Sequence, residues 1–115
     1  MTDKIVVLVT CGSAKEARKI ARTLVEKRLA ACGNVLEVPV RSIYRWKSLI
    51  ESAKEYLLIL KTSVSRFEAL ETTVKSLHSY RVPEIIALPI AAGSPEYLAW
   101  IVESLGPPRR RGQRA

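Results

Sequence analysis

Hydrophobic positions at the start of the chain follow two patterns, one typical of a buried strand and the other of an amphipathic helix. Ile5–Val9 is an uninterrupted apolar run, as expected for a central strand buried on both faces. Ser13 and Glu16 then have the spacing of a capping box, which predicts a helix that continues until Gly33 and Asn34. The apolar stripe of this helix consists of Ala17, Ile20, Ala21, Leu24, Val25 and Ala31.

The next stretch of the pattern predicts two unusually long strands joined by a very short turn. The strands cover Val35–Arg45 and Leu49–Lys61, and each reaches ~40 Å at ~3.4 Å per residue. The usual strand has only about five or six residues. Two helices of so short a chain cannot cover such a ribbon, so we expect its outer part to pack against another copy of the chain. The turn consists of Trp46, Lys47 and Ser48.

The second half of the chain predicts a helix, a strand and an added helix. Ser65 and Glu68 repeat the capping-box spacing at the start of the second helix. A strand over Glu84–Ala91 follows Pro83, and Pro95 lies in the first turn of the last helix. The apolar face of the second helix consists of Phe67, Leu70, Val74 and Leu77. That of the last helix consists of Tyr97, Leu98, Ile101, Val102 and Leu105.

The order strand, helix, strand, strand, helix, strand predicts an α+β fold. We expect a ferredoxin-like βαββαβ sandwich with strand order 4-1-3-2, a long hairpin between the second and third strands, and an added C-terminal helix. Pro39 falls in the second strand and Pro89 in the fourth. Proline is tolerated in edge strands, and these two strands are the edges in that order. The prediction is a single domain over residues 1–106.

Composition and charge narrow the possible functions. The net charge of the 115-residue chain is +8, but four of these charges belong to a basic segment at residues 107–115 that we expect to be a disordered tail. We therefore do not expect nucleic-acid binding as the main function. The sequence contains neither a membrane-spanning run nor a secretory leader, which favours a cytoplasmic location. The arginines of the tail are Arg109, Arg110, Arg111 and Arg114.

One pole of the predicted sheet collects the side chains that can bind a metal ion. Cys11 ends the first strand, the second helix delivers His78 to that end, and Glu84 begins the fourth strand there. A thiolate, an imidazole and a carboxylate suit copper or zinc. The alternative is structural, because a histidine is favoured at a helix C-terminus and a cysteine after a strand often serves packing. Cys32 is expected at the far pole as a core residue, too distant to form a disulfide with Cys11, so both are expected to be free thiols.

Aromatic side chains suggest a ligand cleft or a subunit interface. Tyr44, Trp46, Tyr80 and Trp100, together with Lys61, are the candidates. Tyr44 and Trp46 lie near the hairpin tip, where large aromatic residues commonly anchor subunit contacts, and this favours an interface for these two. The sequence contains no glycine-rich phosphate loop, nucleophile elbow or paired metal-ligand motif, so we do not expect an enzyme.

Five sequence motifs follow one another along the chain: Leu29–Cys32, Ser42–Lys47, Glu55–Thr62, His78–Ile85 and Tyr97–Ile101. These motifs resemble those of the CutA divalent-cation tolerance proteins. The resemblance implies a ferredoxin-like homotrimer in the cytoplasm that is linked to tolerance of copper and other divalent cations. The architecture is also similar to that of the PII signalling proteins. The alternative function is therefore a trimeric sensor of a small anionic ligand or a partner protein. In such a sensor the basic residues Arg45, Lys61 and Arg81 would lie near the clefts between subunits.

Three positions differ from the pattern of that family. Ser48 stands where glycine is usual at the hairpin turn, so the turn must use another geometry. Ser79 replaces a proline after the histidine, which leaves that loop less constrained. Gly33 replaces a small apolar residue after the Ala-Ala-Cys motif.

Overall fold

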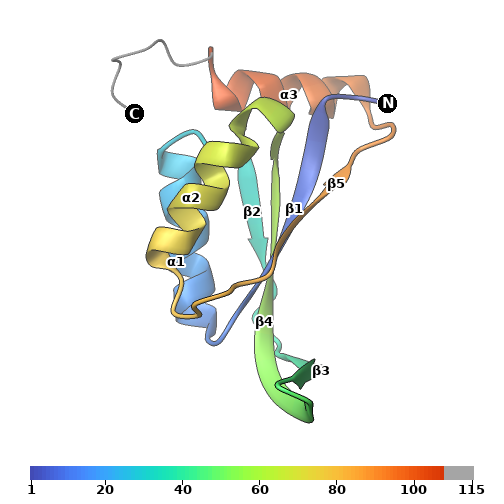
Figure 1. Ribbon diagram of the computed structural model, residues 1–115. Coiled ribbons are helices and arrows are strands. Elements are labelled where there is room, and N and C mark those ends of the chain that lie inside the picture. Colours follow the sequence, from blue (N-terminus) through green and yellow to red (C-terminus); the bar gives the residue numbers. More distant parts are fainter. Residues whose placement is uncertain (108–115) are drawn as a thin grey trace.

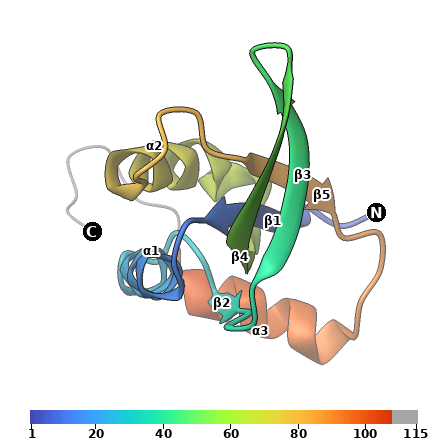
Figure 2. The same cartoon turned by 90° about the horizontal axis from the view of Figure 1, so that it is seen from below.

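The computed structural model describes residues 1–107 and contains a single antiparallel sheet with helices packed on it (Figure 1). Helices α1 and α2 cover one face, and α3 lies across the end of the sheet opposite the hairpin (Figures 1 and 2). The elements are β1 (Lys4–Cys11), α1 (Ala14–Glu26), β2 (Cys32–Val35), β3 (Val40–Trp46), β4 (Leu49–Ser63), a short 3-10 turn (Val64–Arg66), α2 (Phe67–Leu77), β5 (Ile85–Pro89) and α3 (Pro95–Leu105).

The strand order confirms the ferredoxin-like prediction. The sheet runs β2-β4-β1-β5, and β3 also pairs with β4. With β2 and β3 taken together as the second strand, this is the order 4-1-3-2. Val7 lies opposite Leu60 on one side and Ala87 on the other, at the centre of the sheet. The fully buried side chains between the sheet and the two covering helices include Val7, Val9, Ile20, Leu24, Leu58, Leu60, Leu70 and Val74.

The first helix is shorter than predicted. It ends at Glu26 instead of continuing to Gly33, because Arg28 adopts a left-handed conformation with φ of 58°. The amide of Leu29 then donates to the carbonyl of Leu24 at 2.8 Å and turns the chain away from the helix axis. Gly33 lies in β2 instead, where a Cβ atom would stand 2.9 Å from the Cβ of Ala21. Glycine at this position therefore allows α1 to approach the edge strand closely.

The predicted second strand is interrupted. Instead of one strand over Val35–Arg45, the structure has β2 and β3, separated by residues 36–39. Pro39 is the last residue of this interruption. Proline has no amide hydrogen to donate to a neighbouring strand, and it restricts the backbone conformation of the residue before it. The partner strand β4 continues for 15 residues, so the projecting hairpin forms as expected. Its turn is tighter than expected, because Trp46 belongs to β3 and only Lys47 and Ser48 connect the strands, with φ of 50° and 71°.

Three smaller predictions about the second half were also wrong. Ser65 does not cap α2; it lies in the 3-10 turn, where its hydroxyl is 2.9 Å from that of Ser63. The last strand stops at Pro89 instead of Ala91. Val102 is exposed, because α3 packs on Ala31 through Ile101 and Leu105, with Leu98 packed beside them.

A buried arginine joins the ends of two helices. The guanidinium of Arg66 donates to the carbonyl oxygen of Arg28 at 2.5 Å, just past the end of α1. It also donates to the carbonyl oxygens of Leu105, Gly106 and Pro107, at 3.1, 2.9 and 3.2 Å, at the end of α3. One side chain therefore fixes the last helix to the rest of the domain. The arginines of the predicted tail lie outside the described residues.

The hairpin projects well beyond the helices (Figure 1), and its apolar side chains are exposed. Ile43 is 71% exposed, Leu49 and Ile50 are each 63% exposed, and Trp46 is 52% exposed. Within residues 1–107, no helix is both long enough and apolar enough to cross a membrane.

Candidate functional site

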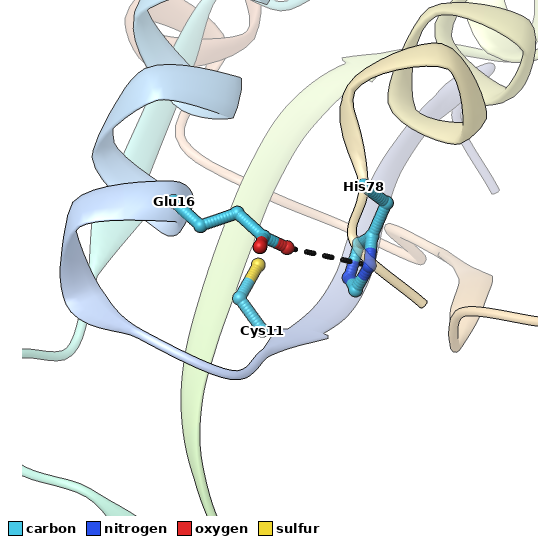
Figure 3. Close-up of side chains that lie close together, drawn as sticks. All are labelled: Cys11, Glu16 and His78. Atoms are coloured by element: carbon cyan, nitrogen blue, oxygen red, sulfur yellow. Dashed lines mark ion pairs between the residues drawn. The ribbon is translucent and has the colours of Figure 1, made fainter. Parts of the chain in front are cut away.

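A cluster of three possible metal ligands lies where β1 ends, α1 begins and α2 ends. Cys11 is the last residue of β1, Glu16 lies in the first turn of α1, and His78 follows α2 directly. Figure 3 shows the three side chains directed toward one another. One ligand atom of each lies within 4.8 Å of the other two. The antiparallel sheet and the two connections that reach this pole bring the three together.

The imidazole of His78 is held by hydrogen bonds on both nitrogens. Its Nδ1 accepts the backbone N–H of Tyr80 at 3.0 Å, and its Nε2 lies 2.8 Å from the carbonyl oxygen of Thr10. Since a carbonyl oxygen only accepts, Nε2 carries a hydrogen and donates it to Thr10. The carboxylate of Glu16 lies 3.3 Å from Nδ1 and accepts the backbone N–H of Ser79 at 3.2 Å. The imidazole is completely shielded from solvent.

The thiol of Cys11 is protonated in this environment. Burial, followed by the nearby carboxylates of Glu16 and Glu55, raises the pKa of Cys11 to about 12. Thiolate, carboxylate and imidazole are the donor set of zinc and copper sites, and their spacing here fits such an ion. Binding would displace the thiol proton and one hydrogen bond of His78, and the charge of the ion favours the thiolate.

The third member of the cluster is Glu16, which the sequence reasoning treated only as part of a capping box. Half of that box is present, because the hydroxyl of Ser13 accepts the amide of Glu16 at 3.1 Å. The carboxylate of Glu16, however, is directed to His78 and Ser79 (Figure 3). The available signal was its position in the first turn of the helix that follows Cys11. Glu84, the carboxylate expected here, is exposed and lines a neighbouring cleft instead.

The cleft lies between the hairpin and the loop that follows α2. Its volume is about 630 Å³, within the usual range of small-molecule sites. Of the aromatic candidates, Tyr44, Trp46 and Tyr80 line it. Trp100 does not; it packs on Tyr97 at the other end of the molecule, with ring centroids 5.4 Å apart. The lining residues are Thr10, Ser42, Ile43, Tyr44, Trp46, Glu55, Tyr80, Arg81, Val82 and Glu84.

The charges of the cleft are mixed and mainly negative. Glu55 and Glu84 face one basic residue, Arg81. Lys61, which the sequence placed near a cleft, hydrogen-bonds to Asn34 on the sheet, and the guanidinium of Arg45 lies 3.5 Å from the carbonyl oxygen of Ser48 at the hairpin turn. The arrangement therefore does not favour an anionic ligand in this cleft.

Tyr80 connects the cleft with the cluster. Burial and a hydrogen bond to Glu55 raise the pKa of the Tyr80 phenol to about 12. The ring of Tyr80 lies 4.8 Å from that of His78, and its backbone amide is the donor to His78 Nδ1. The two sites thus share one short loop.

Both cysteines are free thiols, as predicted. Cys32 is not the core residue expected from the sequence; it is only partly buried, because β2 is an edge strand. Its sulfur lies 3.7 Å from the hydroxyl of Tyr97.

Known proteins resemble this chain along nearly the whole described length. The family model of the CutA1 divalent ion tolerance protein matches residues 5–104. The divalent-cation tolerance protein CutA of Thermus thermophilus is 52% identical over 102 residues, which are 88% of this chain and 97% of that protein. Protein CutA of Mus musculus is 50% identical over 93 residues, 81% of this chain and 52% of that longer protein.

Comparison with a solved structure indicates the same family. The divalent cation tolerance protein Cut A1 from Thermus thermophilus superimposes with a TM-score of 0.87 at 50% identity, covering 90% of this chain and 99% of that one. Sequence and fold therefore agree over the same residues. The chain belongs to the CutA1 divalent ion tolerance protein family.

Proposed function

We propose that the protein acts in divalent-cation tolerance by binding copper or another divalent cation, as a homotrimer and without catalysing a reaction. The observation that carries this proposal is the cluster of Cys11, Glu16 and His78, whose ligand atoms lie within 4.8 Å of one another. The name of the Thermus thermophilus relative, a divalent-cation tolerance protein, agrees with this chemistry.

The cluster favours a borderline cation that can replace a proton. In the absence of an ion the thiol of Cys11 stays protonated, because burial raises its pKa to about 12. A hard ion such as Mg²⁺ prefers oxygen ligands and has little affinity for a thiol. Copper and zinc bind thiolate and imidazole strongly. We therefore expect copper and zinc to bind, and magnesium not to compete with them.

Metal titration of the reduced protein tests the proposal. Cobalt serves as a spectroscopic substitute for zinc, because a thiolate ligand gives an intense charge-transfer band in the near ultraviolet. We expect the band with the wild type and its loss in Cys11→Ser, with weaker metal binding in His78→Ala and Glu16→Gln. Cys32→Ser, which removes the other thiol, is the matched control and should bind as the wild type does.

Two results would count against the site. Equal binding by the wild type and His78→Ala would remove that residue from the ligand set. A loss of binding in Glu84→Gln but not in Glu16→Gln would restore the carboxylate expected from the sequence and remove the one in the cluster.

The proposal of a trimer is based on the exposed hairpin. Large apolar side chains on β3 and β4 are more than half exposed, including Ile43 and Ile50. An exposed ribbon of this kind commonly pairs with or packs on a second copy of the chain, and a head-to-tail contact closes into a ring. The cytoplasmic location expected from the sequence belongs to the same proposal and is tested by cell fractionation.

A further inference from the structure

The cleft beside the metal-ligand cluster combines aromatic walls with a buried negative charge. Tyr44 and Trp46 contribute from β3, and Tyr80 contributes from the loop after α2. Glu55 belongs to β4, at the point where the hairpin leaves the body of the sheet, and is only 8% exposed. The aromatic and acidic groups thus come from three separate segments that meet around one cavity.

Within the described part of the chain, the one basic residue that lines the same cleft, Arg81, forms no ion pair with Glu55. The hydroxyl of Tyr80 hydrogen-bonds to it, but among residues 1–107 it forms no ion pair. A buried carboxylate without a cationic partner is unfavourable, because burial removes its hydration. A ligand that brings a positive charge would relieve this.

The aromatic rings of the cleft would also attract a positively charged ligand. The faces of tyrosine and tryptophan attract a cation within about 6 Å, most strongly when water is excluded, and such rings are the usual recognition groups for quaternary ammonium ligands. The volume of about 630 Å³ accommodates a small organic molecule and is far larger than a bare metal ion needs.

We propose that this cleft binds a small organic cation, an alkylammonium or quaternary ammonium compound. Its charge lies against the carboxylate of Glu55, and its carbon atoms pack between Tyr44, Trp46 and Tyr80. The site is separate from the Cys11, Glu16 and His78 cluster, so the ligand can bind whether or not the metal proposal is correct.

Tryptophan fluorescence tests the proposal directly. The chain has two tryptophans, and the Trp100→Phe variant leaves Trp46, in the cleft wall, as the only one. The intact protein in this background is titrated with choline, with its uncharged analogue 3,3-dimethyl-1-butanol, and with inorganic phosphate. We expect a saturable change with choline, at least tenfold weaker binding of the alcohol, and no change with phosphate.

Two variants assign the binding to the named groups. Glu55→Gln should weaken choline binding at least tenfold, whereas Glu103→Gln, an exposed carboxylate on α3, should leave it unchanged. If Glu55→Gln does not fold, Tyr44→Leu retains an apolar side chain without the ring and should weaken binding several-fold. Equal binding of choline and the alcohol, unchanged binding in Glu55→Gln, or no saturable signal with choline would overturn the proposal; the last result would mean that a neighbouring subunit or solvent fills the cleft.

Discussion

Cys11 and Cys32 are both free thiols, but they differ in burial and therefore in reactivity. Only the thiolate is nucleophilic, and the pKa of Cys11, raised to about 12, keeps its thiolate fraction very small at neutral pH. We expect iodoacetamide to label Cys32 in the native metal-free protein at pH 8, and to label Cys11 only after unfolding. Peptide mass spectrometry distinguishes the two, and equal labelling rates in the native protein would contradict the burial of Cys11.

The same thiol makes stability depend on alkaline pH. Because the pKa of Cys11 is raised in the folded state from 9.0 to about 12, its contribution is fully present below pH 9 and is lost as the pH rises toward 12. We expect the free energy of unfolding, measured with urea, to fall between pH 9 and pH 10 in the wild type. Cys11→Ala should give a flatter profile in that interval, before the phenol of Tyr80 contributes. Parallel profiles would mean that the thiol is not the cause.

Arg66 is the residue whose replacement should most affect stability. Arg66→Met removes hydrogen bonds to four carbonyl oxygens, of which one bond is buried and three are partly buried. We expect a loss of about 3 kcal/mol, since charged hydrogen bonds and unsatisfied buried acceptors each contribute on that order. Arg22→Met is the control: its ion pair with Glu26 is largely exposed and should contribute less than about 0.5 kcal/mol. Similar melting temperatures for the two variants would contradict this.

Individual residues were predictable where the order of elements alone fixes their position. Cys11 and His78 follow a strand and a helix that must end at the same pole, and the sequence was sufficient to expect both there. Glu16 and Glu55 were missed as members of the two sites, because each has an ordinary explanation in its own element. Only tertiary packing shows that one is directed to His78 and that the other is buried in the cleft.

At the scale of the elements, the hairpin turn contains two of the three non-glycine residues with positive φ in the described backbone. Lys47 and Ser48 both have positive φ, a conformation that glycine adopts at little cost and other residues adopt less readily. Ser48→Gly should therefore stabilise the protein by ~1 kcal/mol. The control is Ser52→Gly within β4, where added flexibility should destabilise the strand. Urea unfolding measures both, and destabilisation by Ser48→Gly would exclude this turn geometry.

Boundaries of elements were harder to predict than the elements themselves. The sequence pattern identified the order of strands and helices, because apolar spacing reflects the face that each element buries. The end of α1 was missed because the chain turns at an arginine and not at a glycine. The break in the second strand was missed because the apolar pattern continues through Pro39, although the hydrogen-bond ladder does not.

At the scale of the whole molecule, the exposed hairpin predicts a trimer. Sedimentation should give a mass three times the 12.8 kDa of the chain, persisting at nanomolar concentration. Trp46→Ala removes a large apolar side chain from the hairpin and should weaken or partly dissociate the assembly. Val25→Ala, which shortens an exposed apolar side chain on α1, should not. A stable, folded monomer would overturn the assembly.

One wall of the cleft belongs to the hairpin, which projects away from the core of the domain. Tyr44 and Trp46 belong to β3, which within residues 1–107 pairs only with β4. The four-residue interruption before Val40 separates β3 from the edge of the main sheet. A neighbouring subunit that packs against the hairpin would therefore also position Tyr44 and Trp46. Self-association and occupancy of the cavity then share a free energy of coupling, and the coupling is reciprocal. A ligand that fits the assembled form strengthens assembly by the same factor by which assembly strengthens its binding, so its apparent affinity should change with protein concentration.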